Sequence, residues 1–528
     1  MAPDRSAPRG RAAGATAPLS QETFIAGAEN RIASDAGARS TTAPRAPVWP
    51  RRRTDAPGGT EMRPEPPSTD VPGPSPDPVP VADAARAPNQ FRLLRTRRFA
   101  PLFALQFLGA FNDQTYQKAF VALLTYRLAD RTGVPLEILG VIASALFILP
   151  FALITPTAGQ IADRIDKARM IRVVKAWEVV VMGLAVVGFH SENILLLYFV
   201  LFLMGAQSAM FAPVKYSVLP QYLSRGELVG GNGLVQGSTF LAIIFGAVVG
   251  NELILRDWGV GVVSAVVVGV ALAGFAASLF APPAPPKGRA EPIDPLFPRA
   301  IWRLVARCRQ TWPAFRAILF ISWFWFLGAT FLSLLPAYAR SALRADEGVL
   351  TVLLTSFSLG VAVGALLSER LNRGRVGLKV APWGALGLAL LSAELWLATA
   401  AAPAPETGLH DRASFFASWG GWRVALDFSV LAAFAGVYVT PLNAVLQSEA
   451  PPERRARFIA CSNVVDAAAM TLSAALVAVC VALGLRADDV LALFALSGLP
   501  VALLLAAAAS RSSEEKLALK ARFKARQD

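Results

Sequence analysis

Apolar blocks of about 20 residues recur from residue 99 onward and alternate with short polar stretches. About 20 apolar residues form a helix long enough to cross the hydrocarbon core of a bilayer. The pattern therefore predicts an all-α membrane protein in which twelve transmembrane helices form two pseudo-symmetric six-helix bundles. The predicted spans are 99–126, 136–161, 170–189, 194–212, 230–254, 260–281, 315–339, 349–369, 378–400, 422–446, 457–483 and 488–509.

Polar segments divide the chain into five parts. The longest internal break, 282–314, is predicted to be a cytoplasmic linker between an N-terminal bundle at 99–281 and a C-terminal bundle at 315–510. The second part of this linker, RAIWRLVARCRQTW, predicts an amphipathic helix on the inner membrane surface. Residues 1–98 are rich in Pro, Ala and Arg and show no apolar period, which predicts a disordered cytoplasmic extension. Residues 511–528 predict a basic cytoplasmic tail.

The charge distribution predicts the orientation of the spans. The chain has 54% hydrophobic and 17% charged residues and a net charge of +14, and its Arg and Lys residues gather in the loops after the second, eighth and tenth predicted spans. Loops rich in Lys and Arg stay in the cytoplasm, so both termini are expected there. Because the basic residues are spread over short loops and polar ends, nucleic acid is not an expected partner.

The composition also argues against an enzyme. Two His and three Cys leave most metal and nucleophile chemistry without its usual residues, and no cofactor or metal site is expected. An acyltransferase needs His-x-x-x-x-Asp, but Leu195 stands five residues after His190 and Phe415 stands five after His410. The chain has no GxxxxGK[ST] motif, so transport is not expected to be driven by ATP. Coupling to H⁺ or Na⁺ is left open.

The first predicted span contains a carboxylate. Asp113 lies within FALQFLGAFNDQTYQKAFVALL, next to Asn112 and five residues before Lys118. A charge at bilayer depth costs several kcal/mol and persists where it faces a cavity or a partner. Asp113 is therefore the first candidate for a substrate or ion pathway. The side chains of Asp113 and Lys118 diverge by about 140° on a helix, so Lys118 either faces the cavity or extends toward the surface.

Further polar residues are candidates for the same pathway. Lys215 and Tyr216 lie between Pro213 and Pro220, which are expected to interrupt the helix where it meets the cytoplasm. There Lys215 either holds a phosphate or acts as a positively charged topological anchor. The remaining candidates share helix faces that either line the cavity or form hydrogen bonds between helices; they are Asn232 with Gln236, Asn463 with Asp466, and Asn443.

The two halves of the chain show a weak internal repeat. GQIADRIDKAR (159–169) follows the second span, and GALLSERLNRGR (364–375) follows the eighth. In each, a glycine would let two helices approach closely, and the polar and basic residues after it would latch an inner gate. FAPVKYSVLPQ (211–221) and VTPLNAVLQ (439–447) form a second pair. Repeats of this kind are typical of secondary transporters. The predicted gating residues are Gly159, Asp163, Arg164, Arg169, Gly364, Arg370 and Arg373.

GQIADRIDKAR closely resembles the signature loop of the major facilitator superfamily. The runs QFLGAFNDQ (106–114), FAPVKYSVLP (211–220), LVGGNGLVQGSTFLAIIFG (228–246) and TPLNAVLQ (440–447) are similar to bacterial lysophospholipid transporters. This family moves lysophospholipids across the inner membrane for reacylation. The chain departs from it at Gln114, where many relatives have Asn, and at Gln236, where some have Glu.

The resemblance implies a monomeric, multi-pass secondary transporter of the bacterial inner membrane. It would move lysophospholipid by alternating access, with a lateral opening to the bilayer, and would be linked in function to an acyltransferase or acyl-ACP synthetase. One alternative is an ion-coupled permease or exporter of small amphipathic solutes. Another is an inactive scaffold that recruits a soluble acyltransferase.

Overall fold

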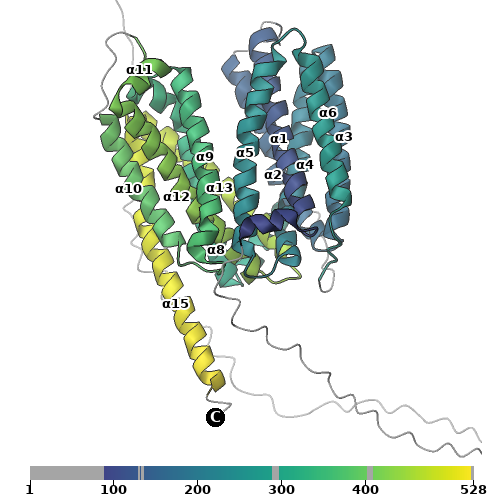
Figure 1. Cartoon of the computed structure of the whole chain (residues 1–528), viewed down its shortest axis with the longest axis vertical. Coiled ribbons are helices and arrows are strands. Elements are labelled where there is room, and N and C mark those ends of the chain that lie inside the picture. Colours follow the sequence, from purple (N-terminus) through teal and green to yellow (C-terminus); the bar gives the residue numbers. More distant parts are fainter. Residues whose placement is uncertain (1–88, 129–130, 132–135, 288–296, 401–407, 525–528) are drawn as a thin grey trace, which may run out of the picture. The chain divides into compact units, whose positions relative to one another are not determined.

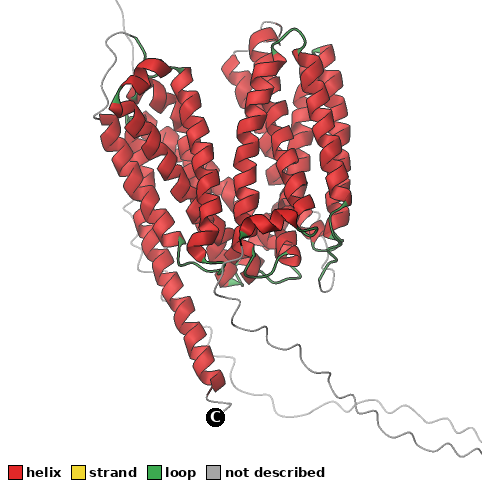
Figure 2. Cartoon of the chain, viewed as in Figure 1, coloured by secondary structure: helices red, strands yellow, loops and turns green. Residues whose placement is uncertain are grey.

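The computed structural model describes residues 89–524 apart from 129–130, 132–135, 288–296 and 401–407 (Figure 1). Its regular elements within those residues are helices joined by short connections (Figure 2). In the first half they are η4 (Gln90–Arg95), α1 (Ala100–Leu123), η5 (Leu124–Leu128), α2 (Leu136–Ala162), α3 (Lys167–Ser191), α4 (Ile194–Tyr222), α5 (Leu228–Ile254) and α6 (Gly259–Leu279).

The second half follows α7 (Phe297–Cys308), a short helix in the predicted linker. Its helices are α8 (Trp312–Ala337), η7 (Tyr338–Ala342), α9 (Glu347–Asn372), α10 (Ala381–Ala400), α11 (Arg412–Ala417), α12 (Trp419–Glu449), α13 (Arg455–Ala482), α14 (Ala487–Leu496) and α15 (Gly498–Lys524).

Ten helices among the described residues are long and apolar enough to cross a membrane. Helices α1 and α3 are not among these ten, although they have 24 and 25 residues. Their sequences include Asn112 and Asp113 in α1 and Lys175 and Glu178 in α3. These polar residues lower the hydropathy of the two helices without shortening them.

One expected span boundary was wrong. Helix α4 continues to Tyr222, ten residues beyond the predicted end at 212, with Pro213 and Pro220 inside it. A proline removes one backbone donor, and packed neighbouring helices can tolerate that loss in a membrane. The twelfth predicted span agrees with the candidate span Ala487–Arg511, within which a turn at Ser497 separates α14 from α15. Pro500 lies in the first turn of α15, where its missing N–H is harmless. Helix α15 then runs through the predicted tail as far as Lys524.

The predicted N-terminal extension ends earlier than expected, because η4 lies within 1–98. The Asn89 side chain caps this short helix by accepting a hydrogen bond from the backbone N–H of Phe91. Gln90 is buried and donates from Nε2 to the Leu366 carbonyl oxygen at 2.8 Å. Residues 1–88 lie outside the described part of the chain, so the prediction of disorder stays untested for them.

The amphipathic helix predicted in the linker is present as α7. Ala300, Leu304 and Cys308 are buried at intervals of four residues and pack toward α2 and α13. The adjacent face, about 100° around the helix, carries the exposed residues Arg299, Arg303 and Arg307. This arrangement has the apolar stripe and polar face typical of a surface helix.

Two separate apolar clusters form the core of the first half. One contains Leu102 and Leu105 of α1, Val174 of α3 and Val214 of α4. The other includes α1 from Tyr116 onward, α3 from Val181 onward and α4 up to Met204. The middle turns of α1, α3 and α4 lie between the clusters and carry polar residues. We call this region the polar layer; its members are Gln106, Asn112, Asp113, Lys175, Glu178, Gln207, Ser208 and Lys215.

The two halves contact each other at the end of the helices where α2 meets α13 and where the first turns of α5 meet α9. We call this the inner end, defined by Asp163 of the α2–α3 connection and Ala456 of α13. Asn232 and Gln447 exchange two side-chain amide hydrogen bonds there, at 2.9 and 2.7 Å. The inner end is therefore closed by direct contacts between the halves.

Candidate functional site

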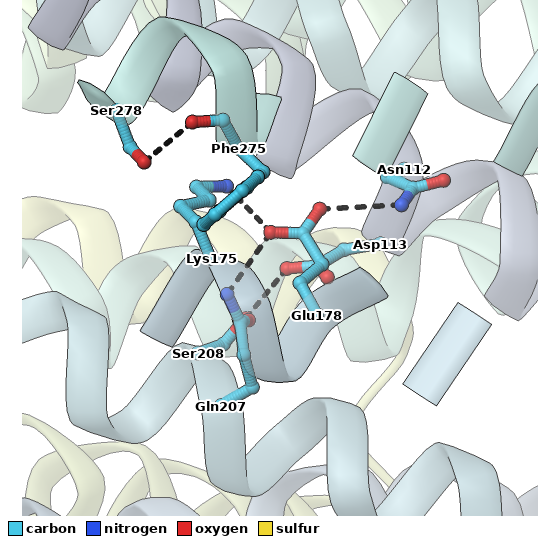
Figure 3. A network of polar contacts seen from close by, with 8 residues as sticks. All are labelled: Asn112, Asp113, Lys175, Glu178, Gln207, Ser208, Phe275 and Ser278. Atoms are coloured by element: carbon cyan, nitrogen blue, oxygen red, sulfur yellow. Dashed lines mark hydrogen bonds and ion pairs between the residues drawn. The ribbon is translucent and has the colours of Figure 1, made fainter. Parts of the chain in front are cut away.

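Asp113 borders a cavity in the polar layer. The cavity has a volume of about 160 Å³, and its polar and charged lining includes Asp113, Lys175, Gln207, Ser208 and Lys215. The Oδ2 atom of Asp113 accepts a hydrogen bond from the Ser208 hydroxyl at 2.6 Å (Figure 3). Asp113 as a whole residue is half-buried, and it lies in the lining of the cavity.

The cavity lies within the first half. Its lining comes from α1 to α5, and its apolar wall includes Phe147, Phe151, Phe211 and Ile243. The cavity forms where the two apolar clusters of the first half leave a gap around polar side chains.

A buried ion pair lies beside this cavity. Lys175 Nζ is 2.6 Å from Glu178 Oε2, and both side chains are almost completely buried. Glu178 also accepts hydrogen bonds from Asn112 Nδ2 at 3.2 Å and from Gln207 Nε2 at 3.1 Å (Figure 3). The carboxylate therefore joins α1, α3 and α4. Removing one partner of such a pair is strongly destabilising, because the other charge stays buried without compensation.

Lys215 faces the same cavity. Its Nζ lies 5.9 Å from the centre of the Phe211 ring and 5.1 Å from that of Tyr216. Within the described residues, the structure shows no ion pair between Lys215 and a carboxylate. The cavity thus presents a carboxylate at Asp113 and an ammonium at Lys215. Lys215 lies almost two helical turns before the end of α4, and the helix runs through Pro213 and Pro220 without the interruption that was expected there.

The other predicted pathway residues of the first half lie outside this cavity. Asn112 points toward Glu178, and Lys118 lies beside α5 near Gly250. The Tyr216 hydroxyl donates to Gln236 Oε1 at 3.2 Å, and its ring packs against the core of the second half. Asn232 pairs with Gln447 as described above.

The predicted pathway residues of the second half form a separate group. Asp466 accepts hydrogen bonds from the hydroxyls of Ser322 at 2.6 Å and Ser462 at 3.3 Å. Asn443 donates back to the Val439 carbonyl oxygen of its own helix. Asn463 lies one turn before Asp466, and its buried Nδ2 has no hydrogen-bond partner among the described residues. The structure therefore does not bring Asp113 and Asp466 together in one cavity.

Two of the predicted gating residues contact the opposite half. Asp163 accepts hydrogen bonds from the backbone N–H groups of Ala456 at 2.9 Å and Arg457 at 3.0 Å, and so caps the start of α13. Burial raises the pKa of Asp163 to about 6, against the opposing effect of these N–H donors and of the nearby charges of Lys167 and Arg457. A Cβ on Gly159 would lie 2.6 Å from Ala460 Cβ, so this glycine permits close contact between α2 and α13.

The other predicted gating residues are placed differently. A Cβ on Gly364 would lie 1.9 Å from the Ala433 carbonyl oxygen, so Gly364 packs α9 against α12 inside the second half. Arg169, Arg370 and Arg373 are exposed, and Arg164 is half-buried. In the described part of the chain, no side-chain ion pair links these four arginines to the opposite half. The two corresponding glycines of the repeat therefore make different contacts: Gly159 packs against the opposite half, and Gly364 packs within its own half.

Sequence reasoning missed Lys175, Gln207 and Ser208 and gave Glu178 no role. A signal was present for two of them, since Lys175 and Glu178 are three residues apart and share a helix face within an apolar stretch. Gln207 and Ser208 gave no such signal, because neutral polar residues in a span commonly bond to neighbouring helices.

Ten described helices that are long and apolar enough to cross a membrane, with a charged internal cavity among them, are the features expected of a membrane transporter. The chain belongs to the Major Facilitator Superfamily, because residues 102–474 match the sequence profile of that family. The superfamily predicted from the loop at 159–169 is thereby confirmed.

Several curated relatives are named lysophospholipid transporter LplT. The protein of Serratia proteamaculans is 28% identical over 67% of this chain and 81% of the relative. Those of Cronobacter sakazakii and Yersinia enterocolitica are 28% and 27% identical over 70% and 74% of this chain, and over 84% and 89% of their own lengths.

Solved structures share the fold at low sequence identity. A bacterial homologue of the iron transporter ferroportin aligns with a TM-score of 0.56 and 12% identity, over 78% of this chain and 99% of that one. The transporter FucP aligns with a TM-score of 0.55 and 16% identity, over 77% of this chain and 97% of its own. At these identities the likeness establishes the fold alone.

Proposed function

We propose that this protein is a secondary transporter that moves lysophospholipid across the bacterial inner membrane. The observation that carries the proposal is the pair of opposite charges on one cavity, Asp113 and Lys215, in a chain similar to LplT proteins. A lysophospholipid headgroup carries a phosphate, which Lys215 can attract. Where the headgroup also carries an amine, Asp113 can accept it.

The size of the cavity determines how the lipid would bind. About 160 Å³ is smaller than the roughly 300–1,000 Å³ typical of a site that encloses a whole ligand. We therefore place only the headgroup in the cavity and leave the acyl chain in the bilayer, which requires a lateral opening. The same small volume favours a second candidate, the ion-coupled transport of a small amphipathic solute.

The proposal includes a topology and a transport cycle. Helices α1 and α3 join the ten apolar helices to give twelve spans in two six-helix bundles, with both termini in the cytoplasm. The inner end then faces the cytoplasm, where Arg225, Arg370 and Arg454 are exposed. Because the contacts of Asp163, Gly159 and Asn232 close that end, the structure corresponds to a state with the cytoplasmic gate shut. Alternating access requires those contacts to break.

Reconstitution in proteoliposomes tests this function. A fluorescent lysophosphatidylethanolamine should enter vesicles that contain the protein faster than it enters protein-free vesicles. Repeating the measurement with an imposed pH gradient and with an imposed Na⁺ gradient identifies the driving ion. D113N should abolish translocation, and K215A should slow phosphate-bearing lipids more than a monoacylglycerol of the same chain length. D257N, which changes an exposed carboxylate in the α5–α6 connection, is the matched control and should transport normally.

Competition separates the two candidates. Excess unlabelled lysophospholipid should block uptake, whereas hydrophilic solutes should not. Uptake that resists lysophospholipid but is blocked by a small amphipathic solute would favour the second candidate. Unchanged uptake by D113N would remove the carboxylate from the mechanism.

A further inference from the structure

The Lys175–Glu178 ion pair is not accounted for by the stability of the fold. Lys175 is 0% exposed and Glu178 is 3% exposed. A buried ion pair commonly gives no more stability than well-packed apolar side chains of similar volume, so its presence is weak support for a structural role. An ionisable residue at membrane depth more often marks a substrate pathway.

Lys175 is positioned to act in the cavity as well as in the pair. It contributes to the cavity lining, and its Nζ lies 5.3 Å from the centre of the Phe211 ring. Lys215 Nζ lies 5.9 Å from the centre of the same ring. The two ammonium groups therefore approach one cavity around a single aromatic side chain.

Gly109 of α1 makes room for the Lys175 ammonium. A Cβ added at this glycine would lie 2.5 Å from Lys175 Nζ, closer than any ordinary contact. Gly109 also lines the cavity, together with Asp113 one turn further on. The ammonium thus rests against the bare backbone of α1 at the edge of the cavity.

Glu178 has other hydrogen bonds that would hold it without Lys175. Asn112 and Gln207 each donate an amide hydrogen to its carboxylate. If the ammonium moved toward the cavity, two donors on α1 and α4 would remain. Glu178 can therefore serve as the resting partner of Lys175 while the cavity is empty.

We propose that Lys175 is a second phosphate-binding residue, which Glu178 holds in the empty transporter and which a substrate phosphate shares when the headgroup enters. This inference rests on the proposed function, because it names the headgroup phosphate as the part of the substrate that the site recognises. Lys175 and Lys215 would bind the phosphate together, and Asp113 would remain for a headgroup amine. A lipid without phosphate would leave the Lys175–Glu178 pair intact.

Paired substitutions separate this role from a structural one. Purified protein in nanodiscs is titrated with lysophosphatidylglycerol and with a monoacylglycerol of the same acyl chain. In K175M/E178M both charges are removed together, so no buried charge is left unpaired. We expect binding of lysophosphatidylglycerol to weaken about tenfold or more, as for loss of a charge-assisted hydrogen bond, and binding of the monoacylglycerol to stay unchanged.

The opposite change should strengthen binding. E178Q keeps a side chain that can accept from Asn112 or Gln207 but removes the charge that holds Lys175. It should bind lysophosphatidylglycerol more tightly than the wild type. Thermal unfolding of each variant shows whether it is folded. E178Q leaves the Lys175 charge buried without its partner, so K175M/E178M decides the matter if E178Q does not fold.

The results that would overturn the proposal are distinct from those that overturn the function. If K175M/E178M binds lysophosphatidylglycerol as the wild type does, or if E178Q binds it no more tightly, the ion pair is only structural. If the wild type itself shows no preference for lysophosphatidylglycerol over the monoacylglycerol, the site does not recognise the phosphate. The proposed role of Lys175 is then wrong as well.

Discussion

At the scale of single residues, Asp163 makes the closed inner end sensitive to pH. Burial raises the pKa of its carboxyl from 3.8 to about 6 in the closed arrangement, whereas a carboxyl that faces water keeps its ordinary pKa. The closed state therefore binds the proton more tightly than an open state would. Protonation of Asp163 favours the closed state by about 3 kcal/mol below about pH 4. This contribution to the free energy of closure is lost as the pH rises through about 6.

Spin labels at I165C and E453C, both exposed near the inner end, can measure this effect. Double electron–electron resonance should show a larger short-distance population at pH 5 than at pH 8. D163N, which carries no titrating group, should show little change over the same range. An equal pH response in both proteins would assign the effect to another group.

The candidate site was only partly predictable, because a sequence shows which residues are polar but not which of them meet. Asp113 was identifiable from its depth in an apolar span. The carboxylate of Glu178 has its hydrogen bonds satisfied by residues 66 positions earlier and 29 positions later in the chain. Such long-range contacts depend on how α1, α3 and α4 pack, and no local pattern in one helix reveals them.

At the scale of helices, the glycines of the repeat should behave differently when substituted. In G159A the new Cβ would lie 2.9 Å from the Ala456 carbonyl oxygen and would push α2 away from α13. We expect fewer molecules with a closed inner end, measured with the same spin labels, and little loss of thermal stability. G183A is the matched control, because a Cβ there meets nothing within 4 Å.

G364A should instead destabilise the second half itself. Its Cβ would overlap the Ala433 carbonyl oxygen within the α9–α12 contact, and overpacking of this kind costs about 1–3 kcal/mol. The melting temperature should fall, while the distribution of spin-label distances at the inner end stays as in the wild type. A fall in melting temperature for G159A of the same size would contradict the distinction.

Most helix positions followed from hydropathy, and the exceptions have physical causes. The predicted end of α4 was wrong, whereas the predicted extent of the last span agrees with the candidate span Ala487–Arg511. Packed neighbours carry α4 through Pro213, whereas the chain breaks at Ser497 just before Gly498. Local propensity alone does not decide between continuing and breaking, because each outcome depends on the surrounding helices.

At the scale of the whole molecule, transport requires the inner end to open and close in each cycle. Arg225 of the first half and Glu449 of the second half form an ion pair at the inner end, and both side chains are exposed, so a covalent link between these positions should trap the closed state. With Cys480 replaced and the buried Cys308 and Cys461 retained, R225C/E449C treated with a short bis-methanethiosulfonate reagent should lose lysophospholipid uptake. Reduction should restore it.

A link inside one half gives the control for that experiment. Glu394 and Arg423 lie on α10 and α12 of the second half, and their partly exposed side chains form an ion pair. Cross-linked E394C/R423C should transport as the untreated protein does, because the helices of one bundle move together in alternating access. If the link between the halves left uptake unchanged, the inner end would not need to open, and rocking of the two bundles would be the wrong mechanism. If both links stopped uptake, the bundles would have to deform internally, and the polar layer of the first half would be the place to look for that movement.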